Sequence, residues 1–149
     1  IAVDSEVNIG QMPVTRKMAV KAGSIDVTGE KTTVLIVDDS GLSRMMLRNI
    51  LEEAGYCIVA EASDGLEGEL AYKQYQPDIV TLDITMPNMD GIECLEKIMC
   101  YDPDANVIMI TAAGQQNKVI KALKEGAKKF VTKPYNVEDV LKNIGEMAE

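Results

Sequence analysis

Histidine and tryptophan are absent from the sequence, and the only aromatic residues are five tyrosines and one phenylalanine. Without histidine, the chain has no Ser-His-Asp triad, no histidine general base, no histidine-ligated zinc and no phosphohistidine of its own. Positive charge is also in short supply, because the formal net charge is −9. Nucleic-acid surfaces need basic side chains and aromatic stacking platforms, so the composition argues against a nucleic-acid partner.

Cysteine is scarce, and its number is odd. Cys57, Cys94 and Cys100 include no C-x-x-C pair, so we expect reduced, mostly buried thiols in a cytoplasmic protein. The apolar runs are only about five residues long, which predicts no membrane-spanning segment. Residues 1–30 carry both signs of charge and lack the apolar centre of a signal peptide.

From Lys31 onward, short apolar runs alternate with longer amphipathic segments. The expected strands are 33–37, 57–60, 79–82, 107–111 and 130–132. Unbroken apolar strands of this length favour a parallel sheet that is covered on both faces. Right-handed crossovers between five such βα units predict a doubly wound α/β sandwich, with a five-stranded parallel sheet in the order 2-1-3-4-5.

The segments between the strands show helical spacing and end signals. Asp64 with Glu67 three residues later is typical of a helix start, whereas Gly55, Pro103 and Gly126 mark helix ends. The expected buried faces, in chain order, are Leu42, Met45, Met46 and Ile50; Leu66, Leu70, Tyr72 and Tyr75; Ile92, Leu95, Ile98 and Met99; Val119, Ile120 and Leu123; and Val137, Val140, Leu141 and Ile144.

Residues 1–30 do not follow this alternation. Residues 24–28 alternate like a strand, and Pro13 and several glycines interrupt the rest. We therefore expect an N-terminal extension at 1–30, such as a linker, a tag or the end of a preceding domain, and one domain at 31–149. A dedicated functional arm is the alternative for the extension.

The polar residues that follow the strands are the candidate site, because ligands of open α/β sheets bind outside the carboxyl ends of the strands. Asp38 and Asp39 follow the first strand, Asp83 the third, Thr111 ends the fourth and Lys133 follows the fifth. Taken singly, each has an ordinary explanation: helix capping for the aspartates, packing for the threonine and solvation for the lysine. Capping accounts for one carboxylate of the first pair, but not for two that face a third.

Three carboxylates drawn together repel one another, and one would take up a proton unless a cation lies among them. Oxygen ligands in an open site suit Mg²⁺. A hydroxyl donor at Thr111 and an ammonium at Lys133 add groups that suit the handling of a phosphoryl group.

Four motifs occur in an order and spacing that resemble a response-regulator receiver domain. They are Asp38-Asp39, the segment 78–91, the segment 111–114 and Lys133-Pro134. The likeness extends over about residues 31–149 and is greatest to single-domain, CheY-like chemotaxis regulators. It implies the flavodoxin-like (βα)5 fold and a role in two-component signal transduction.

The resemblance implies that Asp83 is the phosphoacceptor, which attacks a phosphohistidine on a sensor histidine kinase. Mg²⁺ would be held by the side chains of Asp39 and Asp83 and by the backbone carbonyl of Thr85, with Asp38 acting through water. The protein would then be a phosphoacceptor that assists its own phosphorylation and slow dephosphorylation, and not an enzyme in the usual sense.

The resemblance also implies a switch. Thr111 and Phe130 would form the switch pair, Ala112 would leave room for the phosphoryl group, and Lys133, before a cis bond to proline, would form an ion pair with it. Thr85 and Ala113 lack the amide and acidic side chains that are often seen in chemotaxis regulators. The rate of autodephosphorylation and the need for a separate phosphatase therefore stay open.

Six lysines lie between 118 and 133, against the single acid Glu125. A solvated helix face without a partner explains them equally well. In the family, the fourth helix, fifth strand and fifth helix bind the downstream protein, which would be the flagellar motor switch in a chemotaxis system. We expect no nucleic-acid binding and no membrane insertion.

Two other phosphate-handling classes fit less well. An aspartyl-phosphate hydrolase of the haloacid-dehalogenase type needs a second Asp two residues after the nucleophile, where this chain has Thr85, and a large cap domain. An FMN carrier needs a phosphate cradle where Asp38 and Asp39 would repel the phosphate. Within the receiver interpretation, the alternative is a module from a larger hybrid kinase or transcription factor.

Overall fold

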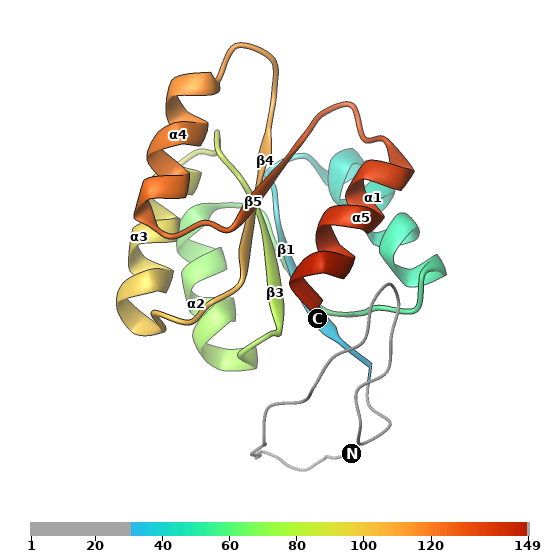
Figure 1. Cartoon of the computed structure of the whole chain (residues 1–149). Coiled ribbons are helices and arrows are strands. Elements are labelled where there is room, and N and C mark those ends of the chain that lie inside the picture. Colours follow the sequence, from blue (N-terminus) through green and yellow to red (C-terminus); the bar gives the residue numbers. More distant parts are fainter. Residues whose placement is uncertain (1–30, 149) are drawn as a thin grey trace.

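The computed structural model describes residues 31–148, in which five strands alternate with five helices (Figure 1). The strands are β1 (Thr33–Val37), β2 (Cys57–Ala62), β3 (Ile79–Asp83), β4 (Val107–Thr111) and β5 (Lys129–Thr132). The helices are α1 (Gly41–Glu53), α2 (Gly65–Tyr75), α3 (Gly91–Tyr101), α4 (Gln116–Glu125) and α5 (Val137–Ala148).

All neighbouring strands pair in parallel, in the order β2-β1-β3-β4-β5, which confirms the predicted topology. Helices α1 and α5 cover one face of the sheet, and α2, α3 and α4 cover the other (Figure 1). Because both faces are covered, every residue of β3 and β4 is buried. This explains why the strands are continuous apolar runs in the sequence.

Alternate strand residues feed two separate cores. On β1, Leu35 and Val37 point to the core under α2, α3 and α4, whereas Val34 and Ile36 point to the core under α1 and α5. Each core lies between the sheet and one layer of helices. The apolar area buried in the two cores is the main contribution to the stability of a domain of this size.

The buried face predicted for α2 is right for Tyr72 and wrong for the other three residues. Leu66, Leu70 and Tyr75 are 49%, 58% and 48% exposed, and the helix packs through Gly65 and Gly68 together with Tyr72. A Cβ atom at Gly68 would lie 2.9 Å from a methyl carbon of Val37 and 3.3 Å from the sulfur of Cys94. The helix therefore lies so close to the sheet that only a glycine face fits, and hydrophobic spacing does not detect glycines.

The predicted faces of three other helices are only partly right. In α1, Leu42, Met45 and Met46 are exposed, and the helix packs through Leu47 and Leu51. The remaining departures are the exposed side chains of Ile120 and Leu123 in α4 and of Val137 in α5. Apolar residues lie on more than one side of these helices, so hydrophobic spacing alone does not determine which side faces the core. The face predicted for α3 is confirmed, since Ile92, Leu95 and Ile98 are buried.

The start of β1 is tied to the start of β3 at the edge of the sheet opposite the candidate site. The backbone N–H and the hydroxyl of Thr33 both donate to Oδ2 of Asp78, at 2.8 and 2.9 Å. The N–H of Asp78 donates in turn to the Thr33 hydroxyl, at 2.9 Å. This reciprocal pair closes the amino end of the central strands.

The three cysteines are free thiols with different exposure. Cys94 is buried, Cys57 is half-buried and Cys100 is exposed, so the expectation of mostly buried thiols is wrong for Cys100. Within residues 31–148, no helix is long and apolar enough to cross a membrane. The extension at 1–30, with the strand expected at 24–28, lies outside the described residues.

Candidate functional site

The carboxyl ends of four neighbouring strands meet at one edge of the sheet. The last residue pair between β1 and β3 directly precedes Asp38 on one strand and Asp83 on the other. The last pair between β4 and β5 contains Thr111, and Lys133 follows its partner. The edge predicted from the sequence therefore gathers these four side chains.

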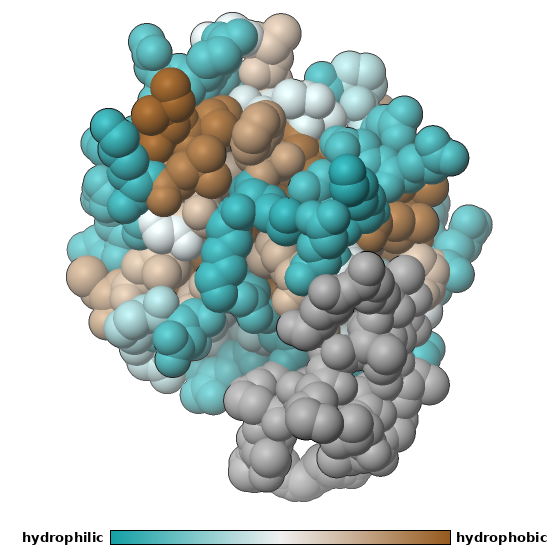
Figure 2. Space-filling view, in the orientation of Figure 1, coloured by the Kyte–Doolittle hydropathy of each residue, from teal (hydrophilic) through white to brown (hydrophobic). Residues whose placement is uncertain are grey.

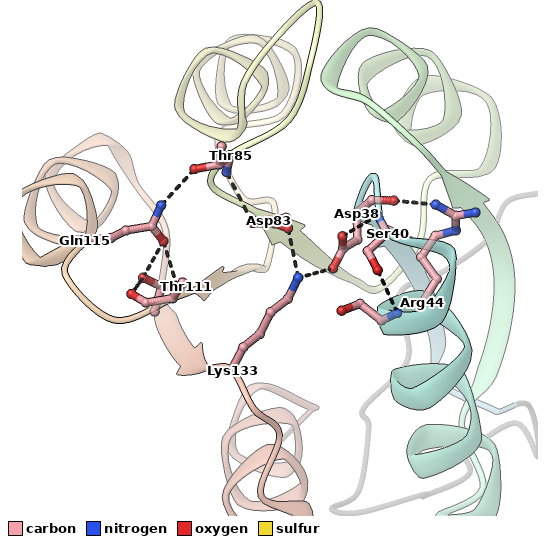
Figure 3. A network of polar contacts seen from close by, with 10 residues as sticks. Asp38, Ser40, Arg44, Asp83, Thr85, Thr111, Gln115 and Lys133 are labelled. Atoms are coloured by element: carbon pink, nitrogen blue, oxygen red, sulfur yellow. Dashed lines mark hydrogen bonds and ion pairs between the residues drawn. The ribbon is translucent and has the colours of Figure 1, made fainter.

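Three carboxylates and one ammonium form what we call the charged half of the site: Asp38, Asp39, Asp83 and Lys133. Each carboxylate places an oxygen within 4.8 Å of the other two. The Nζ atom of Lys133 lies 2.8 Å from Oδ2 of Asp38 and 3.1 Å from Oδ2 of Asp83 (Figure 3). Asp38 and Asp83 are only 2% and 8% exposed, whereas Asp39 is exposed. One ammonium thus serves two buried carboxylates and compensates only part of their charge.

The pKa shifts in the charged half follow from this imbalance. Burial and the neighbouring charge of Asp38 raise the pKa of Asp83, and the contact with Lys133 opposes that rise without cancelling it. Burial alone would lower the pKa of Lys133, but its contacts with Asp38 and Asp83 outweigh burial and raise it. Lys133 is therefore a stable cation, and Asp83 is a carboxylate that holds its negative charge at a cost.

Asp38 is held in place from the start of α1. Its Oδ1 accepts from the backbone N–H of Ser40 at 2.9 Å, and its carbonyl oxygen accepts from Arg44 Nη1 at 2.5 Å. Ser40 also caps α1, because its hydroxyl accepts from the N–H of Ser43 at 3.1 Å. The same turn therefore begins the helix and orients the carboxylate.

Three uncharged side chains form what we call the neutral half: Thr85, Thr111 and Gln115. Oε1 of Gln115 accepts from the Thr111 hydroxyl at 3.0 Å, and Nε2 of Gln115 donates to the Thr85 hydroxyl at 2.8 Å (Figure 3). The backbone N–H of Thr85 donates to Oδ1 of Asp83 at 3.2 Å. The two halves are therefore joined through Thr85.

The carboxylate cluster fits a hard divalent cation. Mg²⁺ prefers oxygen ligands and keeps several waters, and the exposure of Asp39 leaves one side of the cluster open to water. The charge left uncompensated by Lys133 is the second reason, because a cation there removes the remaining repulsion.

An apolar groove lies beside the neutral half, between α4 and β5. It has a volume of about 360 Å³, and its lining includes Thr111, Val119, Ile120, Leu123 and Phe130. The Phe130 ring is 45% exposed. Figure 2 shows the corresponding hydrophobic patch over α4, with hydrophilic side chains around it.

Ala112 and the peptide bond after Lys133, both named from the sequence, also lie at this edge. Ala112 is exposed, and its backbone N–H donates to Oε1 of Gln115 at 2.7 Å. The peptide bond between Lys133 and Pro134 is cis, as expected.

Sequence reasoning missed Gln115, Arg44 and Tyr135. Arg44 resembles any surface arginine of a helix until its contact with the Asp38 carbonyl is seen. Tyr135 is half-buried near Asp38 and Asp83, and burial followed by these two charges raises the pKa of its hydroxyl. Gln115 stands where a helix cap is expected, yet its side chain makes no capping hydrogen bond. A glutamine at the start of a helix, where a capping residue is usual, is the sequence feature that could have indicated its role.

Comparison with known families gives one match over most of the described residues. The family described as "Response regulator receiver domain" matches residues 34–145.

Two curated relatives are chemotaxis proteins. The chain is 49% identical over 116 residues to the chemotaxis protein CheY of Listeria monocytogenes, covering 78% of this chain and 98% of that protein. It is 47% identical over 116 residues to CheY of Thermotoga maritima, covering 78% and 97%.

Solved structures agree in fold. A CheX–CheY–BeF3–Mg complex from Borrelia burgdorferi contains a chain that is 46% identical, with a TM-score of 0.76 and coverage of 78% of this chain and 89% of that one. The response regulator domain of Thermotoga maritima CheB is 34% identical, with a TM-score of 0.74 and coverage of 80% and 97%.

Proposed function

The chain belongs to the response regulator receiver domain family, and from this premise we propose that Asp83 is its phosphoacceptor. The protein is a homologue of the CheY chemotaxis proteins and a response regulator of two-component signalling. What remains to be assigned is which of its own residues accept, hold and report the phosphoryl group.

The observation that carries the assignment is the position of Asp83 between the two halves of the site. Its Oδ2 faces the ammonium of Lys133, and its Oδ1 accepts from the Thr85 N–H. Asp38 is less suited, because it is more deeply buried, at 2% exposure against 8% for Asp83, and because it follows β1, which is not a neighbour of β4 and its Thr111. Asp83 is the carboxylate that contacts both Lys133 and Thr85 and that lies on the strand next to Thr111.

The proposed reaction is the transfer of a phosphoryl group from a phosphohistidine of a sensor histidine kinase. An oxygen of Asp83 forms a bond to phosphorus, the P–N bond breaks, and the imidazole leaves with its electron pair. Lys133 neutralises charge on the incoming group, while the Thr111 hydroxyl and the open space beside Ala112 accommodate its oxygens.

Mg²⁺ belongs to this proposal as the cation of the charged half. Asp39, Asp83 and the Thr85 backbone carbonyl would hold it, with Asp38 acting through water. Its contribution when bound is to offset the negative charge on the phosphoryl oxygens.

We place the output surface on α4, β5 and α5. Support comes from the exposed Phe130 ring, the groove beside it, and the exposed lysines of α4, namely Lys118, Lys121 and Lys124. An acidic, partly apolar protein segment matches this chemistry, and the flagellar motor switch is the expected target in a chemotaxis system. The setting is the cytoplasm, with a sensor kinase as phosphoryl donor.

The loss of the phosphoryl group is also part of the proposal. Thr85 and Ala113 carry neither an amide nor an acid, so the chain offers little help to an attacking water, and slow autodephosphorylation follows. The similar CheY from Borrelia burgdorferi was solved with CheX, which makes a CheX-like protein a candidate partner.

The test uses acetyl phosphate with Mg²⁺ and counts incorporated phosphoryl groups by intact mass. The parent should gain one hydroxylamine-sensitive group, and Asp83→Asn should gain none. Asp64→Asn is the matched control, because Asp64 caps α2 and Asn preserves a cap. Incorporation by Asp83→Asn at the parental level would refute the assignment.

A further inference from the structure

Gln115 has a side-chain arrangement that neither the sequence patterns nor the phosphoryl chemistry accounts for. It is the residue directly before α4, where Ser40, Asp64 and Asp90 stand before α1, α2 and α3. Those three side chains cap their helices, whereas that of Gln115 makes no capping bond. The contribution of Gln115 to the helix comes from its backbone carbonyl, which accepts from the N–H of Val119 at 3.0 Å. Its amide group is therefore free to serve the site.

The amide oxygen of Gln115 takes two donors from the end of β4. The Thr111 hydroxyl lies 3.0 Å from Oε1, and the backbone N–H of Ala112 lies 2.7 Å from the same atom. A hydroxyl has one proton and an N–H has one, so both donors are occupied while Gln115 holds them. The hydroxyl's other acceptor, the carbonyl oxygen of Ala112 at 3.1 Å, lies in the same loop.

These two donors are the neutral donors that a phosphoryl group on Asp83 needs. β4 is the strand next to β3, and Asp83 pairs with Ile110, the residue directly before Thr111. An oxyanion that forms on Asp83 is therefore adjacent to the Thr111 hydroxyl and the Ala112 N–H. An oxygen of Gln115 and an oxygen of the phosphoryl group cannot both use the same two protons.

The amide nitrogen of Gln115 binds the loop that follows β3. Nε2 donates to the Thr85 hydroxyl at 2.8 Å, and the Thr85 N–H donates to Asp83 at 3.2 Å (Figure 3). A primary amide is suited to this task, because it accepts at one atom and donates at the other. Gln115 therefore joins the loop after β4 to the loop after β3.

We propose that Gln115 is a positioning residue that competes with the phosphoryl group for the Thr111 hydroxyl and the Ala112 N–H, and thereby keeps the protein in its unphosphorylated state. This inference rests on the proposed function, in which Asp83 is the phosphoacceptor. On phosphorylation, a phosphoryl oxygen replaces Oε1 of Gln115 as the acceptor of these two donors. The strength with which Gln115 holds them sets how favourable this replacement is.

The experiment measures the affinity of the full chain for beryllofluoride in the presence of Mg²⁺. Backbone NMR signals of Asp83, Thr111 and Ala112 report binding, because the chain has no tryptophan for fluorescence. Gln115→Met keeps the length of the side chain but removes both hydrogen-bonding atoms. Gln115→Glu keeps the acceptor and adds a negative charge. Gln116→Met is the matched control, since Gln116 is the exposed first residue of α4.

Gln115→Met should bind beryllofluoride about fivefold more tightly than the parent, which is the effect of one hydrogen bond of ordinary net strength. Gln115→Glu should bind more weakly than the parent, because a carboxylate accepts the same donors more strongly and repels the anion. Gln116→Met should bind like the parent. A purely structural role would weaken both Gln115 variants and would not move them in opposite directions.

Equal or weaker binding by Gln115→Met, together with parental binding by Gln116→Met, would overturn the inference. Failure of the proposed function gives a different result, because the parent itself would then show no beryllofluoride-dependent shift at Asp83. The two failures are therefore distinguished within one titration series.

Discussion

The two halves of the site differ in how their side chains are held. In the charged half, Asp38 and Asp83 are buried at the ends of central strands and are bound to a lysine and to backbone N–H groups. In the neutral half, Thr111 is also buried at a strand end, but Thr85 and Gln115 lie in loops, and the three side chains exchange ordinary hydrogen bonds between uncharged groups.

The two halves are therefore suited to different tasks. Charge-assisted contacts between buried groups are about twice as strong as neutral ones, and they suit residues that must hold a fixed geometry. Neutral hydrogen bonds near the surface contribute only about 1 kcal/mol each and are readily exchanged. We infer that the charged half supplies the nucleophile and its counter-charges, and that the neutral half sets how favourable the phosphorylated state is and how it reaches Phe130.

The largest effect should come from removing the ammonium of the charged half. Lys133→Met leaves Asp38 and Asp83 buried without their cation, and removal of one partner of a buried pair destabilises by about 3–5 kcal/mol. Because Lys133 is 26% exposed, we expect a smaller loss, of about 2 kcal/mol, in urea unfolding. Phosphorylation by acetyl phosphate should fall at least tenfold. Lys129→Met, which removes a surface ion pair with Glu146, is the control and should change stability by less than about 1 kcal/mol.

The next effect concerns the exposed carboxylate. Asp39→Ala removes a cation ligand and one source of repulsion together, so Mg²⁺ affinity should fall about tenfold while the Mg²⁺-free melting temperature stays equal or rises. Calorimetric titration and thermal unfolding in EDTA measure the two quantities. A variant that binds Mg²⁺ as tightly as the parent would contradict the assignment of the site.

A smaller effect should come from a change in the neutral half that leaves phosphorylation of Asp83 possible but weakens the response to it. Thr111→Ala should still accept a phosphoryl group on Asp83, but the Phe130 ring and α4 should no longer respond to it. Couplings of this kind are worth about 1–3 kcal/mol, so a target peptide would gain less than its usual affinity on phosphorylation. NMR of the Phe130 ring with and without beryllofluoride is the measurement. If the parent's ring is unchanged while Asp83 is fully modified, the route through Phe130 is disproved.

The smallest effect is a pH dependence of stability in EDTA. The pKa of Asp83 is raised in the folded protein, so the folded state binds this proton more tightly than the unfolded state does. Ionised Asp83 therefore lowers stability at neutral pH, and this loss disappears as the pH falls through the raised pKa. Asp83→Asn should melt higher than the parent at pH 7, with a difference that narrows on acidification. A difference that widens would reverse the sign of the interaction.

Strand order and the residues at the strand ends were predictable because they depend on local patterns. Apolar runs such as 33–37 and 107–111 identify buried parallel strands, and parallel order brings their polar ends to one edge. Lys133 could be placed near Asp83 on this ground alone.

The helix faces and Gln115 were not predictable in the same way. α2 packs through Gly65 and Gly68, whose advantage is the absence of a side chain, and this leaves no hydrophobic signal. The role of Gln115 depends on the loop conformation that aims its amide at Thr111 and Thr85, and tertiary contacts set that conformation. A pattern of residue types carries no such direction.

The reciprocal hydrogen bonds between Thr33 and Asp78 have a practical consequence for fusion proteins. β1 is five residues long, which separates Thr33 from the Asp38 end by about 17 Å at the usual rise per residue. A fluorescent protein, an affinity handle or a surface tether joined ahead of Thr33 therefore enters at the far edge of the sheet, where the chain is already anchored to Asp78. Such attachments enter away from the edge that carries Asp83, so we expect that immobilised protein can be assayed for phosphorylation without being released.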